Sequence, residues 1–108
     1  MAEGKLVRDG IPEIIRASGA QPVLYTAGPA EYSARLRDKL REEVDEFLAA
    51  ENSQQALEEL ADVLEVLRAL SGDLGADWHV VESVRTAKAA ERGSFDSRLV
   101  WLRNETAG

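Results

Sequence analysis

The sequence predicts an all-α protein, an antiparallel bundle of about four helices, and three observations support this prediction. Apolar residues recur at spacings of three and four over most of the chain, as they do along one face of a helix. Residues that favour strands gather in only one short stretch, "QPVLYTAGP". The chain has 108 residues and no cysteine, so we expect one domain, residues 1–108, without disulfides.

The first expected helix lies within "VRDGIPEIIRASGA". Asp9 is placed to cap this helix, Pro12 suits a first helical turn, and Gly19 is a stop signal. Residues 21–29 follow, and their composition predicts a brief extended segment that is too short to form a sheet. The N-terminal part therefore contributes one short helix and a connection.

Two longer helices are expected next, the first from residue 30 to about residue 50. Ser53 is a good cap for the second, which should run to about residue 71. Because the link between them is so short, the two helices must be antiparallel neighbours. Asp77 is then placed to cap a fourth helix over "WHVVESVRTAKAAER", and the tail after it is expected to add a short turn or strand.

The two middle helices carry acidic residues on or beside their apolar faces. At about 100° per residue, Glu43 falls between Tyr32 and Leu36 on the first of these two helices and Glu46 lies about 60° away, so both border the apolar stripe. On the second helix Glu59 falls within the apolar arc, and Asp62 lies at its edge. We expect all four to lean inward, and antiparallel packing would bring the two pairs face to face.

Carboxylates that lie close together in a low dielectric must be protonated or held by a cation. Hard divalent ions such as Mg²⁺, with Mn²⁺ as an alternative, prefer oxygen ligands. For these four residues the pattern alone supports a metal site and an ordinary acidic surface equally. The other acidic residues of the two helices are expected to form a solvated face with nearby basic partners: Asp45, Glu51, Glu58 and Glu65 with Arg37, Lys39, Arg41 and Arg68.

Charge and hydropathy exclude several classes of partner. The formal net charge is -7, from 13 basic and 20 acidic residues, which opposes binding to a phosphate backbone, so we expect no duplex nucleic acid. No run of eighteen apolar residues occurs, and the N-terminus lacks a cleavage-like pattern, so we expect no membrane segment and a cytoplasmic location. The broad apolar arc of the third helix predicts a homodimer or a larger assembly.

Short motifs along the chain resemble a known enzyme superfamily. "EEVDE" followed by "EELAD" resembles the E-E-x-x-E and E-x-x-D signature of the MazG-like all-α nucleoside triphosphate pyrophosphohydrolases. "KLVRDGIPEII" and "KAAERGSF" are similar to the phosphoribosyl-ATP pyrophosphohydrolase-like branch of that superfamily. One departure is Gly10, which stands where the branch usually has a lysine, so no role of that lysine carries over.

The resemblance implies Mg²⁺-dependent hydrolysis of a phosphoanhydride. A nucleoside triphosphate or a related nucleotide would yield a nucleoside monophosphate and pyrophosphate, with non-standard nucleotides as the favoured substrates over phosphoribosyl-ATP. By the same resemblance the metal ligands would be Glu43, Glu46, Glu59 and Asp62. Glu42 would be a further ligand or would deprotonate the attacking water, a role that Glu43 could share. The resemblance also implies a homodimer.

Basic residues near both ends of the motif region are candidates for binding phosphate. Lys88 and Arg92 lie on one face of the fourth helix at a spacing of four residues. The same residues would also complement the negative end of the helix dipole. Lys5 and Arg8 are weaker candidates, and a surface ion pair explains Arg8 equally well. A different class of function is a non-catalytic dimerisation or nucleotide-sensing module that retains the acidic helices.

Overall fold

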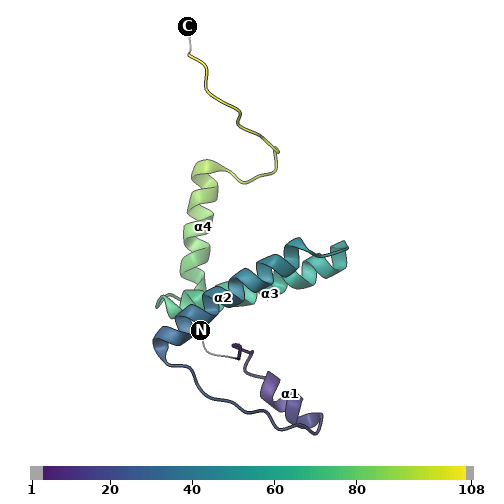
Figure 1. The fold of residues 1–108 in the computed structure, drawn as a ribbon. Helices are drawn as coiled ribbons and strands as arrows, with labels where there is room; N and C mark the ends of the chain where they lie inside the picture. The colour runs from purple at the N-terminus through teal and green to yellow at the C-terminus, as the bar shows by residue number, and fades with distance from the viewer. Residues whose placement is uncertain (1–3, 107–108) are drawn as a thin grey trace. The chain divides into compact units, whose positions relative to one another are not determined.

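The structure is a computed structural model that describes residues 4–106, and its regular secondary structure over that range is entirely helical (Figure 1). The elements are α1 (Ile11–Ala17), α2 (Pro29–Leu48), α3 (Ser53–Asp73) and α4 (Trp78–Arg92). The absence of strands between residues 4 and 106 confirms the predicted all-α class. Among these helices none combines the length and apolar character needed to cross a membrane.

The chain divides into two compact units. The first ends at Ala76 and contains α1, α2 and α3. The second begins at Asp77 and contains α4 and the tail that follows it. The acidic motifs both lie in the first unit.

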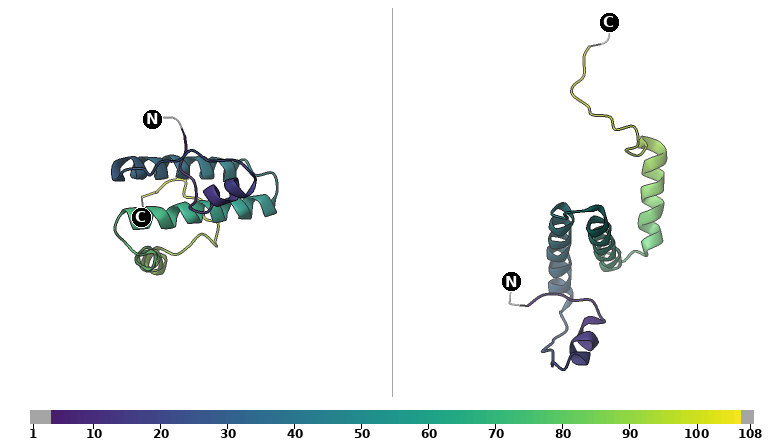
Figure 2. Two further views of the ribbon diagram at one scale, coloured as in Figure 1. Left: turned by 90° about the horizontal axis from the view of Figure 1, so that it is seen from below. Right: turned by 90° about the vertical axis from the view of Figure 1, so that its right-hand side faces the viewer.

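Helices α2 and α3 form an antiparallel hairpin and lie side by side (Figure 2). Asn52 caps α3, because its side chain accepts a hydrogen bond from the backbone N–H of Gln55 at 2.9 Å. The prediction that Ser53 is the cap was wrong: Asn52 has the extended backbone that a cap requires, and Ser53 is already helical. At the other end of the hairpin the hydroxyl of Ser33 donates to Asp73 at 2.6 Å.

Helix α1 is short and begins without a side-chain cap. Its N-cap residue is Gly10, so the prediction that Asp9 caps the helix was wrong. The chain enters α1 through a tight turn in which the N–H of Ile11 donates to the carbonyl of Arg8 at 3.0 Å, and this turn leaves Asp9 outside the helix. The expected proline lies in the first turn, and Gly19, at a φ of 95°, follows the last turn as predicted.

The hairpin encloses little apolar surface. Leu36 of α2 and Val66 of α3 are the buried apolar side chains among the described residues. Along α3 a row of leucines spaced three and four residues apart is between 37% and 66% exposed in the single chain, namely Leu57, Leu60, Leu64 and Leu67. We call these four residues the α3 stripe. The apolar arc from which an assembly was predicted is therefore largely uncovered in one copy of the chain.

Helix α4 and its tail make up the second unit. Asp77 occupies the N-cap position as predicted, but its side chain makes no capping hydrogen bond. Gly93 ends the helix at a φ of 81°, a conformation that glycine adopts without strain. Within residues 93–106 the chain makes one turn, closed by the N–H of Arg98 and the carbonyl of Phe95 at 3.1 Å, and no strand.

Candidate metal centre

Three carboxylates from the hairpin converge on one point. Glu43 and Glu46 come from neighbouring turns of α2, and Glu59 comes from α3. One oxygen from each of the three lies within 4.8 Å of the others. We call these three residues the acidic centre. It contains three of the four carboxylates that the sequence singled out, because antiparallel packing turns the two acidic motifs toward each other.

The three side chains differ in burial. Glu43 is buried, with 7% of its surface exposed, as its position beside the apolar stripe predicted. Glu59 is half-buried. Glu46 is exposed, which contradicts the expectation that it leans inward. An offset of about 60° from Glu43 is enough to place Glu46 at the edge of a helix pair with so small a core.

Two oxygens of the acidic centre are buried and lack a hydrogen-bond partner, Oε2 of Glu43 and Oε2 of Glu59. The other oxygen of Glu43 lies 3.4 Å from Nζ of Lys39. A buried acceptor without a partner destabilises the fold, and two of them beside a third carboxylate add mutual repulsion. Hard divalent cations bind oxygen sets of this kind. The residues present therefore fit a divalent ion.

The surroundings of Glu43 alter its ionisation. Burial raises the pKa of Glu43 above its usual value of 4.5, and the charge of Glu46 and a hydrogen bond to it raise the pKa further, while Lys39 opposes them. The folded chain then holds a proton that the unfolded chain has lost, so ionisation of Glu43 lowers the free energy of unfolding as the pH rises above 4.5. A cation beside the carboxylate acts in the opposite direction by favouring the charged form.

Asp62, the fourth predicted ligand, lies outside the acidic centre. Its Oδ1 accepts a hydrogen bond from Nη2 of Arg8 at 2.6 Å, although the two residues are 54 positions apart. The side chains are 40% and 56% exposed, respectively. Of the two interpretations of Arg8, the ion pair is therefore present, and the role of Asp62 as a metal ligand stays a prediction.

A pocket of about 250 Å³ lies between the N-terminal segment and the hairpin. Its apolar lining includes Tyr32, Leu36 and Val66, and its polar lining includes Arg8, Lys39, Glu43 and Asp62. The pocket thus reaches the acidic centre through Glu43 and has two cationic side chains in its wall. Lys39 was expected only in the solvated face and not as a site residue, although its position four residues before Glu43 is the spacing of a helical ion pair.

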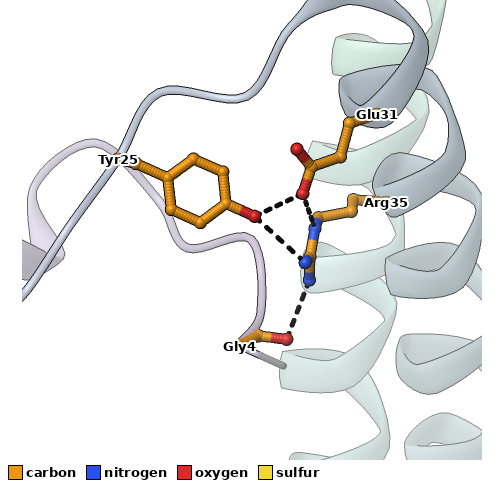
Figure 3. Close-up of polar contacts among 4 residues, drawn as sticks. All are labelled: Gly4, Tyr25, Glu31 and Arg35. Atoms are coloured by element: carbon orange, nitrogen blue, oxygen red, sulfur yellow. Dashed lines mark hydrogen bonds and ion pairs between the residues drawn. The ribbon is translucent and has the colours of Figure 1, made fainter. Parts of the chain in front are cut away.

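A buried arginine ties both segments that flank α1 to helix α2 (Figure 3). Arg35 is 8% exposed, and its guanidinium donates to Glu31 at 2.7 Å, to the carbonyl of Gly4 at 2.8 Å and to the hydroxyl of Tyr25 at 3.2 Å. The hydroxyl of Tyr25 in turn donates to the same oxygen of Glu31. We call these four residues the Arg35 clamp. Its only signal in the sequence is the spacing of four residues between Glu31 and Arg35.

The other predicted residues are not among the three carboxylates that form the acidic centre. Glu42 is half-buried and lines a second pocket of about 230 Å³ together with Lys5. Lys88 and Arg92 lie exposed on α4 in the second unit, and their role in binding phosphate stays a prediction.

The expected solvated face is present, with different ion pairs. The four carboxylates assigned to it are exposed as predicted: Asp45, Glu51, Glu58 and Glu65. Three of the expected basic partners instead pair elsewhere, Arg37 with Asp73, Lys39 with Glu43 and Arg41 with Asp38. Helical spacing explains two of these choices, and packing between α2 and α3 explains the pairing with Asp73.

Comparison with known proteins identifies the family of the chain. The chain is 56% identical over 54 residues to an uncharacterized protein of Mycolicibacterium smegmatis (strain ATCC 700084 / mc(2)155). The similar region is 50% of this chain and 55% of that protein, so the chain spans about half the length of this curated relative. No solved structure matches. Residues 13–88, which include both acidic motifs, match the family model for phosphoribosyl-ATP pyrophosphohydrolase, and the chain therefore belongs to this family of the MazG-like all-α superfamily.

Proposed function

We propose that the protein is a Mg²⁺-dependent nucleoside triphosphate pyrophosphohydrolase. Membership of the family indicates hydrolysis of a phosphoanhydride. The observation that carries the proposal is the acidic centre, in which three carboxylates converge and two buried oxygens lack a partner. The proposed substrates are nucleoside triphosphates and related nucleotides, phosphoribosyl-ATP included, and the proposed role is the removal of non-standard nucleotides.

In the proposed reaction, water adds to the α-phosphorus of the nucleotide. The bond from this phosphorus to the bridging oxygen breaks, and the products are a nucleoside monophosphate and pyrophosphate. Glu43, Glu46 and Glu59 would hold the ion, with Asp62 as a fourth ligand. Bound there, Mg²⁺ or Mn²⁺ would counter the negative charge of carboxylates and phosphates and activate a water for attack.

The chain itself would supply the proton acceptor and the phosphate contacts. Glu42 or Glu43 would take the proton from the attacking water, whichever of the two is not fully occupied as a ligand. Arg8 and Lys39 are placed in the pocket wall beside Glu43, where cationic side chains would bind phosphate oxygens.

The remaining candidates for phosphate binding are Lys5, Lys88 and Arg92. Lys5 belongs to the segment that passes over the hairpin, and the other two belong to α4.

The protein is proposed to act as a homodimer. The proposal is supported by the α3 stripe, whose leucines are between 37% and 66% exposed in one copy of the chain. Two antiparallel hairpins that bury such stripes against each other would complete a helical bundle.

Pyrophosphate release from a panel of nucleotides tests the enzymatic proposal. The panel holds standard and non-standard nucleoside triphosphates and phosphoribosyl-ATP, each with Mg²⁺ or Mn²⁺. Turnover is expected with at least one of them. Glu43→Gln should lower kcat/KM by at least about 100-fold. Residues that only support metal ligands cost an enzyme up to about 100-fold when they are lost, and Glu43 is proposed as a direct ligand.

Glu58→Gln is the matched control, because it removes one exposed carboxylate from α3 next to the acidic centre. It should keep the activity of the unaltered protein. Equal activity in Glu43→Gln and Glu58→Gln would contradict the proposed site. If nucleotides stabilise the protein against heat and none of them is hydrolysed, the protein is a nucleotide-sensing module instead.

A further inference from the structure

The segment from residue 4 to residue 9 is tied to the hairpin at two points that differ in burial. At one end the carbonyl of Gly4 accepts a hydrogen bond from Arg35, whose side chain is buried in the Arg35 clamp (Figure 3). At the other end Arg8 pairs with Asp62, and both of these side chains are partly exposed. Ion pairs with this exposure are weak and are easily exchanged for other partners. The second tie is therefore the one that can open.

Asp62 occupies a position between two possible partners. It lies one helical turn after Glu59, on the same side of α3, and it lines the same pocket as Glu43. While Oδ1 of Asp62 is held by Arg8 at 2.6 Å, its carboxylate is not among those that converge in the acidic centre. To join the acidic centre, the carboxylate of Asp62 would have to turn away from Arg8 or share its oxygens between Arg8 and an ion.

We propose that Arg8 is a displaceable counter-ion of Asp62. It holds this carboxylate in the metal-free chain and releases it to the acidic centre when a divalent ion binds. The proposal rests on the metal site of the proposed function. A divalent ion with an open coordination position can bind the carboxylate of Asp62 directly, whereas the partly exposed ion pair with Arg8 is weak.

The released arginine stays in the pocket. The Arg35 clamp keeps the start of the segment in place through Gly4, so Arg8 cannot move far from the hairpin. A phosphate group of a bound nucleotide would then replace Asp62 as the anionic partner of Arg8. The guanidinium of Arg8 thus exchanges one ion-pair partner, the carboxylate of Asp62, for another, a phosphate of the substrate.

Binding of Mn²⁺ without nucleotide tests the exchange directly. Free Mn²⁺ is measured by electron paramagnetic resonance during titration of the unaltered protein and of Arg8→Gln, Asp62→Asn and the double variant. Since Arg8 competes with the ion for Asp62, Arg8→Gln should tighten Mn²⁺ binding by about two- to fivefold, the range that corresponds to a partly exposed ion pair. In the Asp62→Asn background the same substitution should change nothing.

Two further variants distinguish the effect of the ion pair on the affinity for Mn²⁺ from the effect of net charge. Lys5→Gln removes the same charge from the same segment without touching Asp62, and it should leave the affinity for Mn²⁺ within about twofold. Arg8→Lys keeps the charge with fewer donors, and its affinity should fall between those of the unaltered protein and Arg8→Gln. Circular dichroism checks that each variant is folded.

Three other outcomes of the titrations overturn the inference, and a fourth result bears only on the proposed enzyme. Unchanged or weaker binding in Arg8→Gln means that Arg8 fixes Asp62 in place, and the metal centre survives. Equal tightening in Arg8→Gln and Lys5→Gln means that only net charge matters. If neither the unaltered protein nor any variant binds Mn²⁺, both the metal centre and the exchange are contradicted. Mn²⁺ binding without hydrolysis of any nucleotide removes the proposed enzyme and leaves the exchange standing.

Discussion

Two glutamates of α2 have pKa values shifted in opposite directions by their surroundings. The pKa of Glu43 is raised by burial and by the charge of Glu46. The pKa of Glu31 is lowered below 4.5, first by the hydrogen bond from Tyr25 and then by the one from Arg35. Glu31 therefore has its cation within the fold, whereas Glu43 has only Lys39 at 3.4 Å and an oxygen without a partner.

The Arg35 clamp gives a pH dependence of known sign. Because the pKa of Glu31 is lowered in the folded chain, its contribution to stability is present above pH 4.5 and is lost as the pH falls through the folded-state value. Glu31→Gln should lower the free energy of unfolding at neutral pH and should reduce its further loss between about pH 5 and pH 3. Urea denaturation across this range measures both effects.

Glu51→Gln serves as the control, because Glu51 is exposed in the turn after α2. This variant should keep the acid-induced loss of the unaltered protein. An equally steep loss in Glu31→Gln and Glu51→Gln would show that the clamp contributes nothing to the pH dependence.

Residue burial was predictable where helical period decides it. Glu43 is buried because its angle on α2 places it among apolar side chains, and this angle follows from its position in the sequence at about 100° per residue. The position of Asp62 was not predictable in this way. Its partner Arg8 is 54 residues away, and no local pattern connects them.

At the scale of the element, the turn between α2 and α3 decides whether the acidic motifs meet. Asn52 caps α3 through Gln55, so Asn52→Ala should lower the free energy of unfolding by about 1 kcal/mol. Ser53→Ala, the matched variant at the next position, should stay within about 0.5 kcal/mol of the unaltered protein. Urea denaturation of both variants measures the difference, and a larger loss in Ser53→Ala would contradict the assigned cap.

The helices themselves were predicted more accurately than their caps. Apolar period placed the start of α2 one residue from Pro29 and the end of α3 two residues from Asp73. Asp9 and Ser53 were wrong as caps, because a cap is defined by the backbone conformation at the helix boundary, and several residue types suit it equally. The family and the all-α class depend on the helices and not on these boundaries.

At the scale of the whole molecule, the α3 stripe predicts association. The unaltered protein should be a homodimer at micromolar concentration in light scattering. Leu64→Asp places a charge in the middle of the stripe and should raise the dissociation constant about 30-fold or more, which corresponds to the loss of one central interface residue of about 2 kcal/mol. Sedimentation velocity across a dilution series gives the constants.

Leu74→Asp is the control, since Leu74 is 74% exposed and lies outside the stripe. It should associate as the unaltered protein does. A compact monomer of the unaltered protein at micromolar concentration would contradict the proposed assembly.

The assembly is the feature that the sequence and the structure of one chain predict least completely. The broad apolar arc of α3 indicated that one chain cannot cover it, and the exposed leucines agree with that indication. The identity of the covering surface depends on shape complementarity between two copies, which no pattern in one chain encodes. The phosphate-binding roles of Lys88 and Arg92 are open for a related reason, since spacing on α4 says nothing about which anion the helix meets.

The acidic centre is most directly tested by a crystal structure of the protein grown with Mn²⁺, in which anomalous scattering locates the ion. The expected result is a peak bound by carboxylate oxygens of Glu43, Glu46 and Glu59. With Mn²⁺ at saturating concentration, an anomalous map without a peak at these three residues would contradict the account.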